Sequence, residues 1–217
     1  MSIDTEAYRE ISKVLGEKIR LVAVSKTKPV EDILALYKEG QRDFGENYVQ
    51  ELGEKQGRLP ADIRWHFIGH LQSNKVKYII PFVHLIHGVD SMRLLKEIDR
   101  QAAKAGRVVD VLLQAHIARE ETKFGFDAGE LEQVMDTVRR TPEEWAHVRI
   151  CGLMGMASNT GDEAVVSGEF RALKGLLDRW FPSGGILSMG MSGDYQLAVK
   201  EGSTMVRIGS LLFGKRG

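Results

Sequence analysis

The chain has 217 residues, and its 30 lysine and arginine side chains balance its 30 aspartate and glutamate side chains, which excludes the strong positive charge typical of nucleic-acid-binding or membrane-surface proteins. Cys151 is the only cysteine, so intramolecular disulfides and cysteine-rich zinc sites are excluded, and the sequence shows neither a signal peptide nor an apolar run near the roughly 18 residues of a transmembrane helix. We therefore expect a cytoplasmic protein without nucleic-acid or membrane partners.

Short apolar runs alternate with longer amphipathic segments along the chain. Several runs are apolar at consecutive positions, which is typical of strands covered on both faces of a parallel sheet. Pro29 and Ser91 stand where helices begin, and Gly40 and Gly106 stand where they end. The predicted strands are residues 21–25, 42–45, 65–68, 83–87, 109–115, 149–153, 185–189 and 204–208, and the clearest helices are about 4–17, 29–40, 91–104 and 162–181.

Eight strands that alternate with helices, preceded by an extra N-terminal helix, fit a compact α/β protein of the (β/α)8 TIM-barrel type. A doubly wound open sheet is the alternative, because alternation alone does not separate a closed sheet from an open one. No linker or change in composition divides the chain, so residues 1–217 are predicted to form one domain. A barrel further predicts that functional side chains gather at the carboxyl ends of its strands.

Polar residues and glycines follow the predicted strands. Lys26 ends the first strand, where it is either a surface residue or an amine held for chemistry. Ser192-Gly193 and Gly209-Ser210 follow the last two strands, whose loops commonly bind phosphate in barrels. Arg207 lies in an apolar run, where it either forms a buried ion pair or donates hydrogen bonds to a ligand. An amine, a phosphate cradle and an arginine at one rim indicate pyridoxal 5′-phosphate (PLP) as the cofactor.

Seven motifs, in order, resemble the YggS/PROSC family of PLP homeostasis proteins, which are single-domain relatives of the alanine racemase barrel. The resemblance covers nearly the whole chain and implies the alanine racemase N-terminal-domain fold. The motifs are AVSKTKP (23–29), FGENYVQE (44–51), WHFIGHLQSNK (65–75), TKFGF (122–126), GLMGM (152–156), SMGMSGD (188–194) and GSTMVRIGSLLFGKR (202–216).

The resemblance also implies roles for individual residues. Lys26 resembles the lysine that forms a Schiff base with PLP, and Asn47 resembles a residue that lines the cofactor ring. Ser192, Gly209 and Ser210 resemble the phosphate cradle, and Arg207 resembles the arginine that faces the pyridine nitrogen. One departure is Gln114-Ala115-His116, where the family pattern is close to QVN, so the role of His116 stays open.

The expected function is PLP binding for intracellular homeostasis, by buffering or delivery, without catalytic machinery of its own. A guanidinium only donates hydrogen bonds, so the pyridine nitrogen facing it stays unprotonated and is a poor electron sink. Racemases of this barrel type add a second base from a β domain and a partner subunit, and this sequence ends at Gly217 soon after the eighth strand. One alternative is an amino-acid racemase or lyase with Lys123 or Tyr48 as a local base, and another is a cofactor-free Schiff-base aldolase.

The remaining expectations concern metals and partners. His66 and His70 have the spacing of two ligands on a helix, but the strand-like sequence around them makes a metal site unexpected. His84 and His87 are expected in the core or at a rim, and Lys123 in a loop that approaches the ligand. PLP-dependent apo-enzymes are the candidate protein partners. Without the racemase dimer interface, we expect a monomer.

Overall fold

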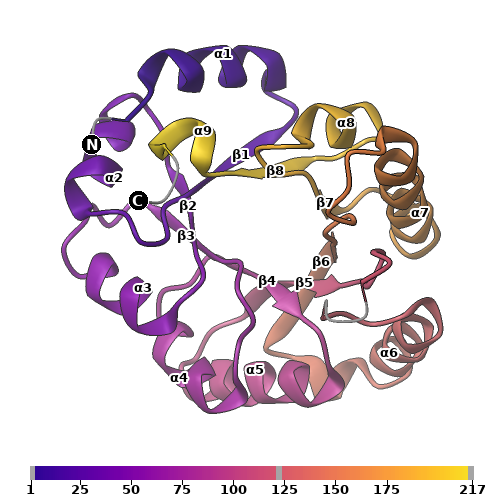
Figure 1. The fold of residues 1–217 in the computed structure, drawn as a ribbon. Coiled ribbons are helices and arrows are strands. Elements are labelled where there is room, and N and C mark those ends of the chain that lie inside the picture. The colour runs from indigo at the N-terminus through magenta and orange to yellow at the C-terminus, as the bar shows by residue number, and fades with distance from the viewer. Residues whose placement is uncertain (1–2, 121–123, 215–217) are drawn as a thin grey trace.

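A closed ring of eight parallel strands forms the centre of the protein, and helices surround it (Figure 1). The computed structural model describes residues 3–120 and 124–214. Each strand pairs with the next in the chain, and the first pairs with the last. The predicted (β/α)8 barrel is therefore confirmed. The strands are β1 (Arg20–Val24), β2 (Asp43–Glu46), β3 (Arg64–Phe67), β4 (Leu85–Val89), β5 (Val109–Gln114), β6 (Val148–Met154), β7 (Ile186–Ser188) and β8 (Met205–Ile208).

The fourth strand differs most from its predicted position. It begins at Leu85, although the apolar run in the sequence begins at Val83. The amide of Val83 donates a hydrogen bond to the carbonyl oxygen of Ile79, so Val83 belongs to the turn that ends the preceding helix. The sequence predicts too early a start for this strand because Val83 is apolar and buried, like a strand residue, although it lies in the turn.

The four longest described helices begin where short polar side chains accept hydrogen bonds from backbone amides. Ser91 accepts one from Leu94, as predicted, and Asp127 and Glu130 form a capping box. The four predicted helices are present, together with others that were not predicted. They are α1 (Thr5–Leu15), α2 (Val30–Lys38), α3 (Val49–Gln56), α4 (Val76–Ile79), α5 (Met92–Lys104), α6 (Ala128–Arg140), α7 (Glu163–Trp180), α8 (Tyr195–Lys200) and α9 (Ser210–Phe213), with 3-10 turns η1 (Ser73–Lys75) and η2 (Pro142–Trp145).

Side chains alternate between the two surfaces of the barrel wall. In β1, Leu21 and Ala23 belong to the large core between strands and helices, whereas Val22 belongs to a small separate cluster. That cluster draws on five strands and so fills the barrel interior: its buried members are Val22, Leu85, Leu112, Met154 and Met205. Buried polar side chains share the same interior, and they are described below. Within the described residues, no helix is long and apolar enough to cross a lipid bilayer.

Candidate functional site

A pocket of about 330 Å³ lies at the carboxyl ends of β1, β2, β7 and β8. Its position follows from the barrel, because the loops after parallel strands meet at one rim. All six residues predicted for the cofactor site line it: Lys26, Asn47, Ser192, Arg207, Gly209 and Ser210. Val24, Lys28, Ile68, Met156, Met191, Gly193 and Gly214 also line it.

The pocket is positively charged although the chain as a whole is neutral. Lys26, Lys28 and Arg207 line it, and none of its described lining residues is acidic. Clustered cations with apolar walls concentrate the field and favour an anionic ligand. Ile68, Met156 and Met191 supply those apolar walls. The pocket therefore suits a ligand with a flat apolar body and a negatively charged group.

The Lys26 loop is fixed from both sides. Thr27 has a φ of 64°, a left-handed conformation that is rare for a β-branched residue. Its amide donates a hydrogen bond of 2.6 Å to Oε1 of Glu51 in α3. Lys28 Nζ donates to the carbonyl oxygen of Phe213 at 2.8 Å, so this loop also holds the C-terminal segment against β1. A non-glycine residue in this conformation marks a loop whose geometry is imposed by its surroundings.

Asn47 carries an unsatisfied buried polar atom in the pocket wall. Its Oδ1 is buried and has no hydrogen-bond partner. The loop after β3 packs against its backbone, since a Cβ at Gly69 would lie 2.4 Å from the carbonyl oxygen of Asn47. Buried polar groups are rarely unpaired in proteins, so this acceptor is an exception, and it lies behind the pocket surface rather than on it.

Arg207 is buried in β8, and three acceptors fix its guanidinium. Nη1 donates to the carbonyl oxygen and to Oγ of Ser188, at 2.8 and 2.6 Å, and Nη2 donates to the carbonyl oxygen of Gly155 at 3.2 Å. Burial lowers the pKa of Arg207 to about 10, against the attraction of Asp194, so it remains a cation at neutral pH. Its bonds to described residues go to carbonyl and hydroxyl oxygens rather than to a carboxylate, so a ligand can still use its charge.

The loops after β7 and β8 are joined at the pocket. Ser192 Oγ accepts a hydrogen bond from the amide of Gly209 at 3.3 Å. Gly193 also lines the pocket, and a Cβ added there would meet no other atom within 4 Å. Gly209 lies closer to β1, where a Cβ would approach Val24 at 3.2 Å. These two loops contribute hydroxyls and backbone donors to one wall, and none of the described residues that they place in the pocket lining is acidic.

Two of the three other residues considered in the sequence, Tyr48 and His116, lie away from this pocket. Tyr48 is 54% exposed and lines a second pocket, beside His70 and Tyr78, rather than the pocket of Lys26. His116 is half-buried, and its Nε2 lies 2.9 Å from the carbonyl oxygen of Glu120. Lys123 lies outside the described residues. Of the two proposed local bases, Tyr48 therefore has no place in the pocket wall.

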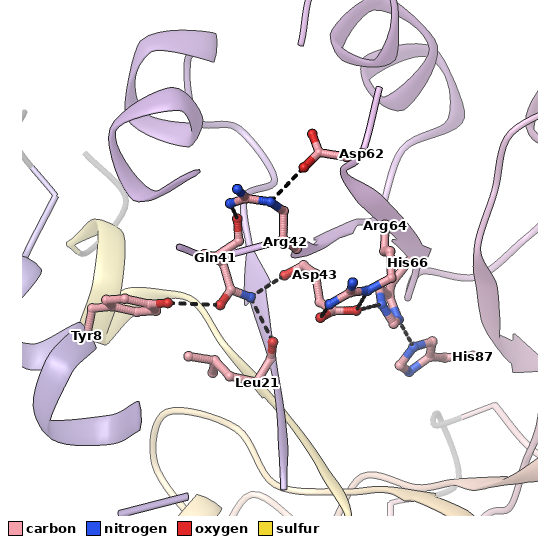
Figure 2. Close-up of polar contacts among 9 residues, drawn as sticks. All are labelled: Tyr8, Leu21, Gln41, Arg42, Asp43, Asp62, Arg64, His66 and His87. Atoms are coloured by element: carbon pink, nitrogen blue, oxygen red, sulfur yellow. Dashed lines mark hydrogen bonds and ion pairs between the residues drawn. The ribbon is translucent and has the colours of Figure 1, made fainter. Parts of the chain in front are cut away.

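The histidines form a polar cluster in the barrel rather than the pair suggested by their spacing. His66 is buried in β3 and contacts Asp43 and His87, whereas His70 lies at the rim and contacts Asp90. Asp43, His66 and His84 bring ligand-type atoms within 4.8 Å of one another. However, Arg64 forms a two-pronged ion pair with Asp43 (Figure 2), and its charge opposes a cation there. This cluster is therefore built as a hydrogen-bond network.

Sequence reasoning missed Lys28 and the connection between the histidines and Arg207. Lys28 stands two residues after Lys26, but its contact with Phe213 spans almost the whole chain. The histidines did carry a signal. His66 alternates with Trp65 and Phe67, which belong to the core outside the barrel wall, and His87 shares its side of the strand with Leu85, which belongs to the barrel interior. What they contact inside could not be read from either strand alone.

Comparison with known proteins gives a consistent result. The family model described as "Alanine racemase, N-terminal domain" matches residues 5–217. A pyridoxal phosphate homeostasis protein of Aquifex aeolicus is 40% identical over 202 residues, which cover 91% of this chain and 87% of the relative. The protein of the same name from Synechocystis is 39% identical over 215 residues, which cover 96% of this chain and 97% of the relative.

Solved structures agree with the fold. PipY of Synechococcus elongatus, in the structure with PLP bound, is 34% identical with a TM-score of 0.86 and covers 96% of this chain and 99% of its own. Its structure without PLP has a TM-score of 0.89 at 36% identity, with the same coverage. An alanine racemase from Streptomyces lavendulae is 17% identical, with a TM-score of 0.78 over 99% of this chain and 58% of its own. This last likeness concerns the fold alone.

Proposed function

This chain belongs to the family of the alanine racemase N-terminal domain, and from that premise we propose that it binds PLP and serves in PLP homeostasis. The observation that carries the proposal is the pocket, which gathers Lys26, Asn47, Ser192 and Arg207 at one rim of the barrel. The relatives named pyridoxal phosphate homeostasis proteins and the PLP-bound PipY structure support the same function.

The pocket fits the chemistry of PLP. A primary amine suits the aldehyde, three cationic side chains suit a phosphorylated ligand, and apolar side chains suit the faces of a flat ring. Asn47 lines the same pocket and adds a polar side chain to its wall. The volume of about 330 Å³ lies at the lower end of the range for small-molecule sites.

We assign one role to each part of the pocket. Lys26 attaches the cofactor as a Schiff base: its Nζ bonds to the aldehyde carbon, and one water leaves. Ser192, Gly209 and Ser210 hold the phosphate with hydroxyl and backbone donors, and Asn47 lines the ring. The guanidinium of Arg207 donates toward the ring nitrogen. When bound, PLP itself supplies an electrophilic carbon and a conjugated ring that can accept electrons.

The proposed function is binding and buffering rather than turnover. Arg207 stays protonated and can only donate, so it keeps a facing ring nitrogen unprotonated and weakens the ring as an electron sink. The runner-up, an amino-acid racemase or lyase, needs a base beside the ring, and Tyr48 lines a different pocket. Lys123 remains its candidate base. The aldolase alternative is disfavoured by the names of the relatives.

The covalent site is tested by visible absorption of the purified protein after PLP is added. We expect a Schiff-base band that is lost in Lys26→Ala. The matched control is Lys28→Ala, because Lys28 lines the same pocket but its Nζ is bound to the carbonyl oxygen of Phe213. That variant should bind PLP more weakly and keep the band. Borohydride reduction followed by peptide mass mapping should place the added mass on Lys26. A band that persists in Lys26→Ala would contradict the assignment.

Turnover and delivery are separate measurements. Rates at ordinary enzymatic levels with a panel of amino acids would favour the racemase or lyase alternative. For delivery, the PLP-loaded protein is mixed with a PLP-dependent apo-enzyme, and recovered activity is compared with that given by free PLP at equal concentration. We also propose that the protein is a cytoplasmic monomer. Sedimentation of the loaded protein tests the oligomeric state, and cell fractionation tests the location.

A further inference from the structure

A continuous chain of hydrogen bonds crosses the barrel interior and ends at Arg207. Asp43 Oδ1 lies 2.9 Å from Nε2 of His66, and Nδ1 of His66 lies 2.9 Å from Nε2 of His87. His87 Nδ1 lies 2.9 Å from Oγ of Ser188, which is 2.6 Å from Nη1 of Arg207. Figure 2 shows the first part of this chain, from Arg64 through Asp43 and His66 to His87. It connects the amino-terminal ends of β2 and β3 with the ligand pocket.

The hydrogen bonds in this chain all run in one direction. Arg207 can only donate, so Ser188 Oγ accepts from it. The carboxylate of Asp43 can only accept, so with both histidines neutral the Ser188 hydroxyl donates its proton to Nδ1 of His87. A neutral His87 that accepts at Nδ1 carries its proton on Nε2 and donates to Nδ1 of His66. His66 in turn donates from Nε2 to Asp43. The geometry therefore fixes the tautomer of both histidines.

Every member from Asp43 to Arg207 is protected from water, whereas Arg64 at the outer end is exposed. His66, His87 and Ser188 have no exposed surface, and Arg207 and Asp43 are 4% and 5% exposed. A buried hydrogen bond is broken at a cost, because water does not replace it. The Ser188 hydroxyl is therefore held in one orientation by His87, and it holds Nη1 of Arg207 in turn. The hydrogen bond to Ser188 therefore helps to set the direction in which the remaining N–H groups of Arg207 point toward a ligand.

We propose that His87 is a positioning residue for Arg207: acting through Ser188, and held by His66 and Asp43, it aims the guanidinium at a ring-nitrogen acceptor and so makes the pocket selective for a pyridine ring. This inference rests on the proposed PLP function for the identity of the ligand. Neither His87 nor Ser188 lines the pocket, so neither acts by touching the ligand.

The test compares PLP with its analogue in which C–H replaces the ring nitrogen. Both compounds keep the aldehyde and the phosphate, so both can bind, and only the nitrogen can accept from Arg207. We expect the wild type to bind PLP about tenfold more tightly than the analogue, as for one hydrogen bond to a charged group. In Ser188→Ala and His87→Leu, the ratio of the affinity for PLP to the affinity for the analogue should fall toward one. A purely structural defect would weaken both compounds equally and keep the ratio.

Two further variants complete the test. Ser203→Ala removes another buried hydroxyl, one that contacts backbone carbonyls of β7 and β8 but not Arg207, and it should keep the ratio. His87→Asn retains an acceptor toward Ser188 and should restore part of the ratio lost in His87→Leu. If His87→Leu fails to fold, Ser188→Ala decides the matter alone. An unchanged ratio in Ser188→Ala overturns the inference, whereas failure of the wild type to bind either compound overturns the PLP function itself.

Discussion

The ammonium group of Lys55 lies 2.7 Å from Oε1 of Glu46, and both side chains are buried in the wall of the barrel beside the Lys26 loop. Lys55 also bonds to Oε1 of Glu51 at 2.6 Å and to the carbonyl oxygen of Ser25 at 2.8 Å. Burial raises the pKa of Glu46, while the charge and hydrogen bond of Lys55 act in the opposite direction. This pair therefore joins α3 to β2 and to the backbone that precedes Lys26.

Replacing Lys55 should be strongly destabilising. Lys55→Met leaves Glu46 buried without its charged partner and with only the Ser25 hydroxyl bonded to Oε1, and we expect the free energy of unfolding to fall by about 3–5 kcal/mol. The double variant with Glu46→Gln should recover much of that loss, since no uncompensated charge remains. Urea unfolding measures the free energy of unfolding of the single and the double variant. Lys174→Met is the control, because its pair with Asp178 in α7 is exposed and its loss should cost less than about 1 kcal/mol. Equal effects of the two lysine variants would contradict the prediction.

The buried histidines should make stability fall below pH 6.5. Burial lowers the pKa of His66, and burial together with the charges of His66 and Arg207 lowers that of His87 well below 6.5. Below pH 6.5 the unfolded chain then binds protons that the folded chain does not. Unfolding free energy should therefore drop by up to about 1.4 kcal/mol per pH unit for each histidine. His87→Gln should show a shallower slope in pH-dependent urea unfolding. An unchanged slope would mean that His87 titrates alike in both states.

Asp43 should stabilise the fold at neutral pH and lose this effect in acid. Burial alone would raise its pKa, but hydrogen bonds from Arg64 and His66 outweigh burial and hold the pKa well below 3.8. A carboxyl with a depressed folded-state pKa contributes stability above its unfolded pKa, and this is lost as pH falls. Asp43→Asn should cost about 3 kcal/mol at pH 7, with a narrowing difference from the wild type below pH 3.8. A difference that stayed constant into acid would contradict this account, as would a similar cost for the exposed Asp178→Asn.

Gly69 should matter for ligand binding through backbone proximity. Its added Cβ would lie 2.4 Å from the carbonyl oxygen of Asn47, so Gly69→Ala must push the two loops apart and displace Asn47 from the pocket wall. We expect at least tenfold weaker PLP binding, measured by absorption titration. The control is Gly168→Ala in α7, where a Cβ meets no other atom within 4 Å and alanine should raise stability by about 0.5–1 kcal/mol. Equal PLP affinity in both variants would rule out this role for Gly69.

The sequence predicted the barrel because its signal is local and repeated. Consecutive apolar residues mark strands, and Ser91 marks a helix start where the structure has one. It predicted which residues share the rim, since the strand ends of a barrel converge: Lys26, Asn47 and Arg207 do line one pocket. The roles assigned to these residues in binding the cofactor remain predictions. Contacts across the interior were beyond sequence reasoning, because the chain of Asp43, His66 and Arg207 depends on register between strands far apart in the chain.

The pocket lies across the seam where the first and last strands meet. In β1 and β8, Val22 is paired with Arg207, and Lys28 bonds to Phe213 across 185 residues of sequence. Contacts of such long range form only at the entropic cost of closing a long loop. A ligand held by Lys26 on one side and Ser210 on the other would fasten that seam. Loss of the cofactor would then lower the kinetic barrier to opening the barrel, so the loaded protein should resist proteolysis longer than the empty one.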